Sequence, residues 1–338
     1  MNSNIHIIHI NNVANVGSNI VNALRRLGYS AELFPLNTMF KDKNKKCPSW
    51  ILVPFNKFEE IWRFRKFIRR HSNAILHVHY GTFAYLPLIF RRKFYLHIHG
   101  TDIRKHVSSP ILGSVIRLGL KKAEKVFYST PDLERLIHPY RQDAVFLPNP
   151  IDLEMIENLS RQDESKGIFI VSKLDDFKGY ETVIAALASL FEEGFEYPVK
   201  MLDFGNQANR FLPMINAMNG GSIELLGRMH HLNFLEEIAR SRCVVGQLST
   251  GALGVTELEA LALGVPLICR FDYPNSFKTI PPIINVNDEV SLVSAIKRIM
   301  SSNITDEYRR EAMEWVKNNV DLMVVTKKLL AYYNEFAE

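Results

Sequence analysis

Residues 251–268 constrain the fold of this chain most strongly, because they combine a tight turn, a helix start, a helix stop and the next strand in a short space. Gly251 and Gly254 allow the backbone to approach a ligand closely. The helix that begins near Val255 would direct its free amides and the positive end of its dipole at an anion. Gly264 then ends the helix, and a strand follows. This order of elements is typical of an α/β domain.

Strands and helices alternate along the rest of the chain. Ile5–Ile10 predicts a strand, Ser18–Leu27 a helix and Ala31–Phe34 a second strand. Another alternating set starts at Ile168–Val171, after the string Pro148–Pro150. A chain of 338 residues also exceeds what one core usually supports. We therefore predict two doubly wound, Rossmann-like α/β domains that face a central cleft.

The proline string marks the predicted domain boundary. Residues 1–150 form the amino-terminal domain and residues 151–318 the carboxyl-terminal domain, and the helix within 319–338 is expected to pack back on the first domain. The polar segment Ser160–Lys166 is expected to extend the hinge, and Lys41–Lys46 to form a charged loop.

Charge divides at the same boundary. Residues 1–150 contain 23 Lys and Arg against 9 Asp and Glu, whereas residues 151–338 contain 18 against 27. The basic half is expected to meet an anionic membrane surface, because no nucleic-acid-binding module accompanies its charge. No apolar run is long enough to span a membrane, and the first residues lack the pattern of a signal peptide. We predict a cytoplasmic protein, soluble or peripheral on the inner face of the membrane.

The segment Phe58–His71 has the pattern of a basic amphipathic helix. Apolar residues recur at helical spacing, and between them stand Arg63, Lys66, Arg69 and Arg70. One face is expected to pack on the first domain and the other to meet anionic lipid. The alternative is a solvated basic helix on the outside of the sheet.

Two lysines follow the first strand of the second domain. Lys173 and Lys178 stand in the loop between the strand and the helix that begins at Gly179. Two cations at the carboxyl end of a strand could neutralise a diphosphate. A pair of solvated loop lysines is the alternative, but the spacing to Gly179 favours the phosphate role.

Histidines alternate at the ends of two strands of the first domain. His97 and His99 would lie on one face of a strand, and the pair His77 and His79 stands on the strand before it. Alternating histidines could form a metal site, but no cysteine or carboxylate completes a ligand pattern, so we expect none. The three cysteines are far apart, which agrees with a reducing compartment.

Together, the segments 97–104, 168–179 and 246–268 resemble the retaining GT-B glycosyltransferases of family 4. The family signature has an acidic residue, a Gly-aromatic-Gly turn, three apolar residues, Leu-Glu-Ala and then Gly-x-Pro, and this chain is similar to it up to Pro266. It departs from the signature at Gly251, where the family places a first glutamate. The resemblance implies the GT-B arrangement of two Rossmann-like domains and catalysis without a metal or a cofactor.

The resemblance also implies a role for each candidate residue. Lys173 and Lys178 would contact the phosphates of the donor, His99 would support the reacting centre of the sugar, and Glu259 would bind the ribose. The other predicted donor-binding residues are Gly251, Leu253, Gly254, Val255, Gly205, Arg228 and Met229. The predicted acceptor-binding residues are Gly17, Asp102 and Arg104.

The function implied is that of a retaining hexosyltransferase. It would move a sugar from a nucleoside-diphosphate sugar, held by the second domain, to a glycan or lipid-linked acceptor of polysaccharide biosynthesis, held by the first. No protein nucleophile is then required, because the leaving phosphate helps to take the proton of the acceptor. Gln247 is a candidate for the sugar contact that the missing glutamate would make. Two alternatives stay open: a nucleotide-sugar epimerase of the same shape, and a degenerate protein that binds a sugar nucleotide without turnover.

Overall fold

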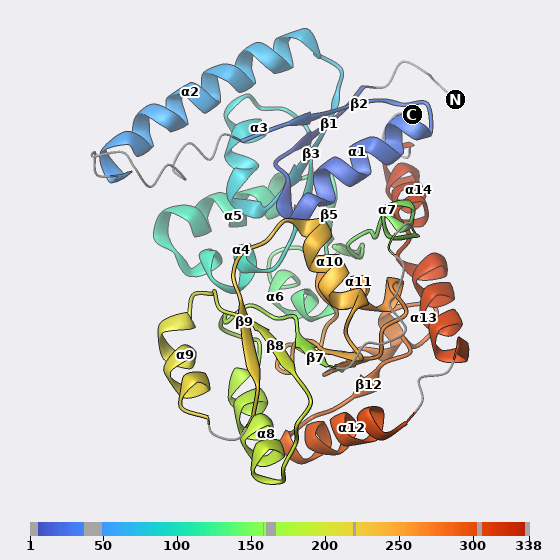
Figure 1. Cartoon of the computed structure of the whole chain (residues 1–338). Helices are drawn as coiled ribbons and strands as arrows, with labels where there is room; N and C mark the ends of the chain where they lie inside the picture. Colours follow the sequence, from blue (N-terminus) through green and yellow to red (C-terminus); the bar gives the residue numbers. More distant parts are fainter. Residues whose placement is uncertain are drawn as a thin grey trace. The chain divides into compact units, whose positions relative to one another are not determined.

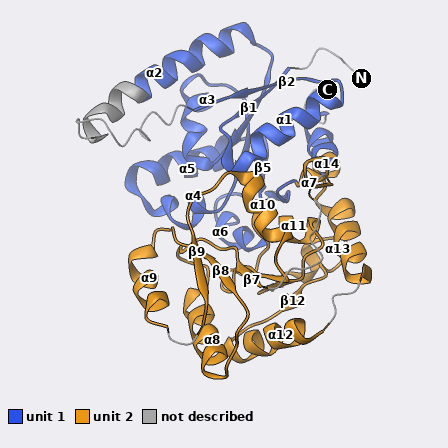
Figure 2. Cartoon of the chain, in the orientation of Figure 1, with its two compact units in different colours: residues 1–150, 325–338 blue, residues 151–324 orange. Residues whose placement is uncertain are grey.

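The computed structural model describes residues 6–36, 49–157, 159, 167–218, 221–302 and 306–334, and of residues 49–56 the backbone alone. The predicted loop Lys41–Lys46 and the predicted hinge segment Ser160–Lys166 lie outside the described residues. The chain divides into two compact units, which we call unit 1 (residues 1–150 and 325–338) and unit 2 (residues 151–324) (Figure 2).

The described part of unit 1 contains a parallel sheet (Figure 1). Its six strands stand in the order β2-β1-β3-β4-β5-β6. The strands are β1 (His6–Ile10), β2 (Ser30–Phe34), β3 (Ile75–His79), β4 (Tyr95–Ile98), β5 (Val126–Tyr128) and β6 (Val145–Phe146). The helices are α1 (Val16–Arg26), α2 (Ser49–Arg70), α3 (Tyr85–Ile89), α4 (Thr101–Arg104), α5 (Pro110–Lys122), α6 (Glu134–Ile137) and most of α14 (Leu322–Asn334). Parallel strands bring their carboxyl ends to one edge of the sheet.

The two faces of the unit 1 sheet differ in chemistry. One face packs apolar side chains such as Ile8, Leu76 and Leu96 against residues of α2 and α5. The alternate positions carry imidazole and aromatic rings, which Tyr333 of α14 contacts from the same side. Successive side chains of a strand point to opposite faces, so the alternating sequences of β1, β3 and β4 produce this division.

The described part of unit 2 also contains a parallel six-stranded sheet, in the order β12-β11-β10-β7-β8-β9. The strands are β7 (Ile168–Ile170), β8 (Val199–Leu202), β9 (Ile223–Leu226), β10 (Cys243–Val245), β11 (Leu267–Cys269) and β12 (Ile284–Asn285). The helices are α7 (Leu153–Glu157), α8 (Tyr180–Glu192), α9 (Ala208–Asn216), α10 (His231–Ala239), α11 (Val255–Ala262), α12 (Glu289–Ser301) and α13 (Asp306–Asn319).

Unit 2 buries apolar side chains on both faces of its sheet. Ile168 belongs to a cluster with residues of α8, α9 and α12, whereas its neighbour Phe169 belongs to a cluster with residues of α10, α11 and α13. Helices that cover both faces of a parallel sheet are the mark of a doubly wound architecture. The predicted α/β fold class is therefore confirmed.

The main local difference from prediction is the length of α2. This helix starts at Ser49, well before the predicted start at Phe58. Pro54 stands in the added stretch, and proline argues against a helix interior in a sequence. None of the described helices combines the length and the apolar composition that crossing a membrane requires.

Candidate functional site

Loops at the carboxyl edge of the unit 2 sheet carry the residues predicted to bind a donor. They follow β7, β8, β9 and β10, and β7 and β10 are the neighbours at which the strand order reverses. Ligands of doubly wound sheets bind at such a reversal. The Leu248 amide donates to the Lys178 carbonyl at 3.0 Å, and the Gln207 amide to the Leu174 carbonyl at 2.8 Å, so adjacent loops are joined.

Lys173 and Lys178 supply positive charge at this edge. Lys173 is exposed and Lys178 half-buried, and no ion pair or side-chain hydrogen bond of either is found among the described residues. Gly179 follows with φ +76°, and a Cβ there would lie 2.9 Å from the Cβ of Leu248. Glycine tolerates both the left-handed backbone and this close contact. The loop therefore packs on the loop after β10 while both ammonium groups stay available to an anion.

Gln247 holds the turn after β10 from inside and is 1% exposed. Its amide nitrogen donates to the carbonyls of Ala252 (3.0 Å) and Arg270 (2.8 Å). Its Oε1 accepts from the amides of Ser249 (3.0 Å) and Thr250 (2.7 Å). These four bonds use the whole hydrogen-bonding capacity of the side chain. They correct the suggestion from sequence that Gln247 contacts the sugar.

Helix α11 begins after Gly254, and a buried carboxylate lies in its first turn. Glu257 is 0% exposed and accepts from the amides of Gly254 and Gln247, both at 3.0 Å, and from the Thr256 hydroxyl at 3.1 Å. A negative charge is favourable at a helix amino terminus. The Gly254 amide, predicted to bind the donor, is thus already hydrogen-bonded, so a phosphate would depend on the lysines and on other amides of the turn.

A second carboxylate lies against Gly251. This glycine has φ +66°, and a Cβ added to it would lie 2.3 Å from Oδ2 of Asp272. Asp272 follows β11, its amide donates to the Gly251 carbonyl at 2.9 Å, and its Oδ2 accepts from Nε of Arg270 at 2.9 Å. The Asp272 side chain remains 38% exposed. A carboxylate from the neighbouring loop therefore stands where a side chain at position 251 would begin.

Glu259 forms a pair with a histidine that the sequence analysis missed. Its Oε1 lies 2.7 Å from Nε2 of His231, the first residue of α10. Burial raises the pKa of the Glu259 carboxyl, while the hydrogen bond to that carboxylate raises the pKa of His231. The predicted ribose ligand thus already has an imidazole partner. Only the position of His231 at the start of the helix that follows β9 could have marked it in the sequence.

The remaining predicted donor residues lie in the same loops with different exposures. A Cβ at Gly205 would lie 2.1 Å from the Leu174 carbonyl oxygen, so close packing of two loops requires glycine there. The guanidinium of exposed Arg228 lies 4.5 Å from the centre of the Phe204 ring. Met229 and Val255 are half-buried. Leu253 is 2% exposed and belongs to a hydrophobic core, so its side chain supports the turn and is not open to a ligand.

Asp102 organises the loop after β4 in unit 1. It is fully buried, and its oxygens accept from the amides of Gly100 (2.8 Å), Gly81 (2.9 Å), Ile103 (3.1 Å) and His99 (3.3 Å). Burial raises the pKa of its carboxyl, and these amides oppose that shift. Direct contact with an acceptor, which the sequence predicts for Asp102, would cost one of these bonds. The geometry gives it the role of holding the loop beside His99.

Arg104 and Gly17 also make contacts within unit 1. Nε of Arg104 donates to Oδ2 of Asp132 at 3.2 Å. Gly17 is buried in α1, where a Cβ would lie 2.6 Å from the Asn11 carbonyl oxygen and 3.4 Å from the ring of His79. Acceptor binding by either residue stays a prediction.

A histidine layer lies on one face of the unit 1 sheet and comprises His9, His77, His79, His97 and His99. Parallel pairing of β1 with β3 places His9 beside His77, a link between distant segments that the sequence analysis missed. Burial lowers the pKa of His9 and His97 to about 3, and it lowers the pKa of the other three rings well below the usual value. The layer is therefore neutral at physiological pH.

Histidine nitrogens of this layer are close enough together to suggest a metal site. One nitrogen each from His9, His77 and His79 lie within 4.8 Å of one another, as do those of His79, His97 and His99. However, Nδ1 of His9 lies 2.8 Å from Nε2 of His79. Two imidazoles on one tetrahedral zinc ion would place their nitrogens about 3.3 Å apart. The spacing is that of a hydrogen bond.

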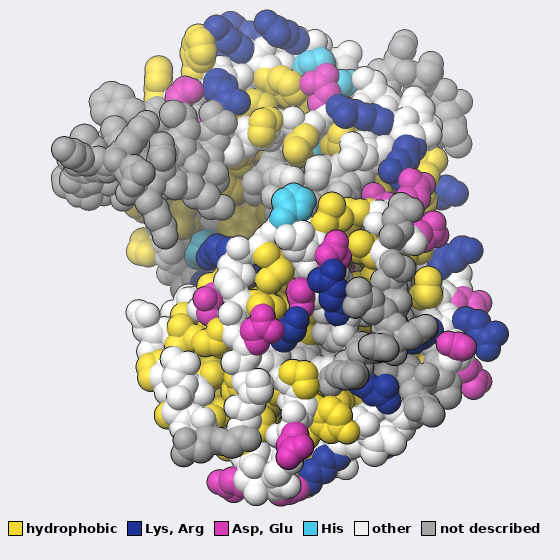
Figure 3. Space-filling model, in the orientation of Figure 1, with side chains coloured by type: hydrophobic (Ala, Val, Ile, Leu, Met, Phe, Trp, Pro, Cys, Tyr) yellow, Lys and Arg dark blue, Asp and Glu magenta, His cyan; other side chains and the backbone are white. Residues whose placement is uncertain are grey.

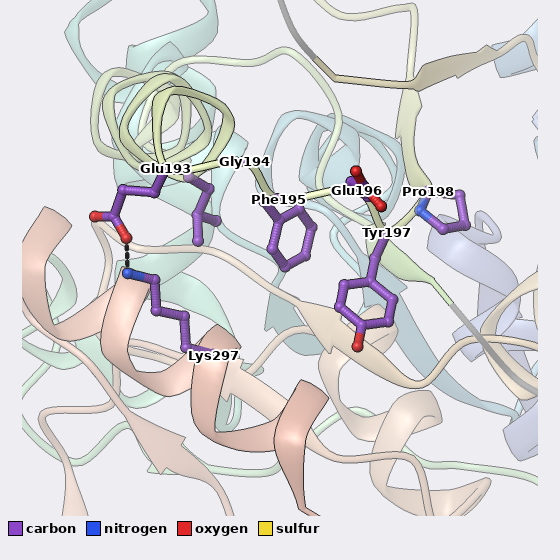
Figure 4. Close-up of a pocket in the computed structure, with 8 residues that line it drawn as sticks. Glu193, Gly194, Phe195, Glu196, Tyr197, Pro198 and Lys297 are labelled. Carbon is purple, nitrogen blue, oxygen red and sulfur yellow. Dashed lines mark hydrogen bonds and ion pairs between the residues drawn. The ribbon is translucent and has the colours of Figure 1, made fainter.

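A pocket of about 580 Å³ lies at the other end of the unit 2 sheet. It is lined by Leu190, Glu193, Gly194, Phe195, Glu196, Tyr197, Pro198 and Lys297 (Figure 4). Pro198 directly precedes β8, whereas the predicted donor loops follow the strands. No residue of the predicted site lines this pocket, and Glu193 and Lys297 pair with each other in it.

No protein-family profile and no curated protein sequence matches this chain. Solved structures do match over nearly its whole length. Sucrose-phosphate synthase from Thermosynechococcus elongatus is 15% identical with a TM-score of 0.74, over 98% of this chain and 99% of its own. Alr3699/HepE from Anabaena in complex with UDP-glucose is 12% identical with a TM-score of 0.68, over 98% and 99%.

A putative UDP-N-acetylglucosamine 2-epimerase from Listeria monocytogenes is also similar, at 13% identity and a TM-score of 0.59, over 98% of this chain and 96% of its own. At such identities the likeness concerns the fold. The two doubly wound units and the matches to glycosyltransferases along almost the full chain show that this protein has the GT-B fold.

Proposed function

We propose that this protein is a retaining glycosyltransferase whose donor is a nucleoside-diphosphate sugar. Unit 2 binds the donor, with Lys173 and Lys178 at the diphosphate and the pair of Glu259 and His231 at the ribose. Unit 1 binds the acceptor, and His99 makes a hydrogen bond to the transferred sugar. The similar fold of a protein solved with UDP-glucose supports a nucleotide sugar as the donor.

The observation that carries this proposal is the pair of available cations beside the glycine turn. Loss of a nucleoside diphosphate leaves negative charge that must be stabilised as the bond breaks. Lys173 and Lys178 have no charge partner in the described structure, and the Lys178 loop is tied to the loop after β10 through Leu248. Two cations at a strand-order reversal, where doubly wound sheets bind their ligands, would attract the diphosphate of a donor.

Asp272 supplies the carboxylate for the sugar hydroxyls in this proposal. Its oxygen occupies the space beside Gly251, and its side chain remains partly exposed. A carboxylate accepts two hydroxyl hydrogen bonds well, and such charge-assisted bonds are stronger than neutral ones. The carboxylate absent from position 251 is thus replaced from the next loop. Retention then proceeds without a protein nucleophile, as the leaving phosphate takes the acceptor proton.

The acceptor is proposed to be a glycan precursor or a lipid-linked sugar at an anionic membrane. Helix α2 buries Phe64 and Ile68 but leaves Phe58 73% and Trp62 48% exposed, and Nζ of Lys66 lies 3.5 Å from the Trp62 ring. Basic side chains gather at the carboxyl end of this helix (Figure 3). Aromatic and basic groups together suit a lipid interface. Co-sedimentation of the protein with anionic vesicles measures this binding. If the bound fraction does not change with salt concentration or with lipid charge, this assignment is wrong.

Product analysis tests the enzymatic proposal. The full chain is incubated with UDP-, ADP- and GDP-hexoses, with and without a lipid-linked or oligosaccharide acceptor. We expect nucleotide release that depends on the acceptor and a product with the anomeric configuration of the donor. An inverted product would exclude retention, and binding without turnover would point to a degenerate protein.

A nucleotide-sugar epimerase is the second candidate, because a putative UDP-N-acetylglucosamine 2-epimerase has a similar fold. Epimerisation at C2 needs an acid and a base that can reach the sugar. Glu257 and Asp102 are fully buried and hydrogen-bonded to several amides, which disfavours that role. An epimerised donor that forms without an acceptor would favour this candidate over transfer.

A further inference from the structure

The histidine layer contains a continuous series of hydrogen bonds that ends at His99. The Tyr333 hydroxyl lies 2.7 Å from Nδ1 of His77 and 3.5 Å from Nε2 of His9. Nδ1 of His9 lies 2.8 Å from Nε2 of His79, and Nδ1 of His79 lies 3.0 Å from Nε2 of His99. Each ring therefore uses one nitrogen toward the next, and the series runs from the buried interior to the half-buried end of β4.

Neutral rings force a single direction on this series. A neutral imidazole has one N–H donor and one acceptor nitrogen, so the choice made at one ring sets the choice at the next. Nε2 of His77 is buried and has no hydrogen-bond partner among the described atoms. If His99 donated to His79, and His79 to His9, the series would continue through Tyr333 and leave an N–H on that buried nitrogen. Orphaned buried N–H groups are rarer than unpaired acceptors, so donation runs from His9 toward His99.

We propose that His9, His79 and Tyr333 are positioning residues that hold His99 as the neutral tautomer with its proton on Nδ1. His99 then donates a hydrogen bond to an oxygen of the transferred sugar and cannot accept a proton, because its Nε2 lone pair is occupied by His79. The sugar contact rests on the proposed function, whereas the tautomer does not. The proposal explains why buried imidazoles, and not apolar side chains, fill this face.

The Asn149 side chain also interacts with His99. This interaction raises the pKa of His99, against the larger effect of burial, which lowers it. His97 stacks on His99 with ring centres 4.5 Å apart, but its neighbour is the Leu147 carbonyl and it contributes no described bond to the series. His97 is therefore a matched control for His79. Both rings are fully buried in the histidine layer, but His97 stands outside the series of hydrogen bonds.

Nitrogen NMR tests the tautomer directly in the full chain. Long-range proton–nitrogen spectra of protein with 15N-labelled histidine separate Nδ1–H from Nε2–H rings, and the His99→Gln variant assigns the His99 signals. We expect His99 to be neutral at pH 7 with its proton on Nδ1. A His99 with its proton on Nε2, or a charged ring, would overturn the proposal whatever reaction the protein catalyses.

Substitutions at His79 separate positioning from packing. His79→Leu removes the donor, so we expect His99 to move to the Nε2–H tautomer that free imidazoles prefer. His79→Asn places an amide nitrogen near the position of Nδ1 and should keep the wild-type tautomer, as should His97→Leu. An unchanged tautomer in His79→Leu would contradict the proposal. The wild-type spectrum decides the question even if His79→Leu does not fold.

Kinetics with UDP-glucose as the donor probe then link the tautomer to the reaction. We expect His79→Leu to lower kcat about 10- to 100-fold, the effect of one lost hydrogen bond from His99, with KM for the donor changed less than about threefold. His79→Asn should recover most of this loss, and His97→Leu should stay close to wild type. Equal losses in all three variants would show a packing effect only. A stoichiometric transition metal in the purified protein would also overturn the proposal, because the metal would coordinate the histidine nitrogens that the series of hydrogen bonds requires.

Discussion

Units 1 and 2 have the same kind of parallel sheet but treat polar groups at its carboxyl edge in opposite ways. In both units the strand order reverses beside the first strand, between β1 and β3 in unit 1 and between β7 and β10 in unit 2. The unit 1 edge holds neutral imidazoles that bond to one another. The unit 2 edge holds two lysines without a described charge partner. Similar topology therefore carries neutral polar rings at one edge and positive charge at the other.

The two edges differ because polar groups of unit 1 have hydrogen-bond or ion-pair partners within the unit, whereas two lysines of unit 2 have none among the described residues. In unit 1, Asp102 satisfies its carboxylate with backbone amides, and Arg104 is paired with Asp132. In unit 2, internal bonds satisfy Gln247 and Glu257, and charge is left over at Lys173 and Lys178. An anionic ligand at this edge would pair with these two lysines.

Removal of Lys178 tests the charge of unit 2. We expect Lys178→Ala to lower kcat/KM for transfer about 100-fold, because one electrostatic donor to the leaving diphosphate is lost. Lys297→Ala is the control, since this lysine pairs with Glu193 in the pocket at the other end of the sheet. Steady-state assays of nucleotide release measure both. If the two variants lose kcat/KM to within a few-fold of each other, Lys178 does not contact the diphosphate.

The packing of unit 1 is tested at Gly17. A Cβ at this position would collide with the Asn11 carbonyl and press on the His79 ring, so Gly17→Ala should lower the free energy of unfolding by about 1–3 kcal/mol. Gly28→Ala is the control, because Gly28 has φ +85° but open space around it, and about 1 kcal/mol is expected. Urea unfolding compares the two. A smaller effect at Gly17 than at Gly28 would show that α1 is packed loosely on the layer.

The proposed sugar carboxylate is tested at Asp272. Asp272→Ala should raise KM for the donor about 10-fold, the effect of one lost charge-assisted hydrogen bond, with little change in melting temperature. Asp306→Ala, at a carboxylate that is 88% exposed, serves as control. Donor titrations of both variants supply the comparison. If the two variants bind the donor equally well, Asp272 does not contact it.

The pair of His231 and Glu259 predicts a small dependence of stability on pH. The hydrogen bond raises the pKa of His231 above its ordinary value of 6.5. The stability that this bond adds to the folded protein is therefore complete below pH 6.5. It is lost as the pH rises through the pKa of His231 in the folded state. From about pH 6 to about pH 8.5, the wild-type melting temperature should fall by about 2 °C relative to His231→Gln. If the melting temperatures of the two proteins change in parallel with pH, this prediction is wrong. His230→Gln, a substitution at the neighbouring histidine, is the control.

Local sequence patterns predicted the fold class and the loops of the candidate site. Alternation of strands and helices, the turn at Gly251–Gly254 and the lysine loop are all properties of short segments. Glu257 was also within reach, since it stands three residues after Gly254 as in a capping box.

The missed residues depend on contacts between distant segments. His9 joins the histidine layer through strand register, His231 meets Glu259 from the start of α10, and Asp272 reaches Gly251 from the loop after β11. No spacing within one segment encodes such pairs. The sequence therefore indicates the edge of the sheet but not which side chains complete the site.

Binding of nucleoside diphosphates to the full chain is the decisive test of the donor site in unit 2. A ligand that binds only the folded state raises the melting temperature with concentration. We expect at least one of UDP, ADP and GDP, or a hexose derivative of it, to stabilise the wild-type protein. The Lys173→Ala/Lys178→Ala variant should lose this stabilisation, and Lys297→Ala should keep it. No stabilisation by any of these nucleotides, or equal stabilisation of all three proteins, would show that the two lysines do not form a diphosphate site.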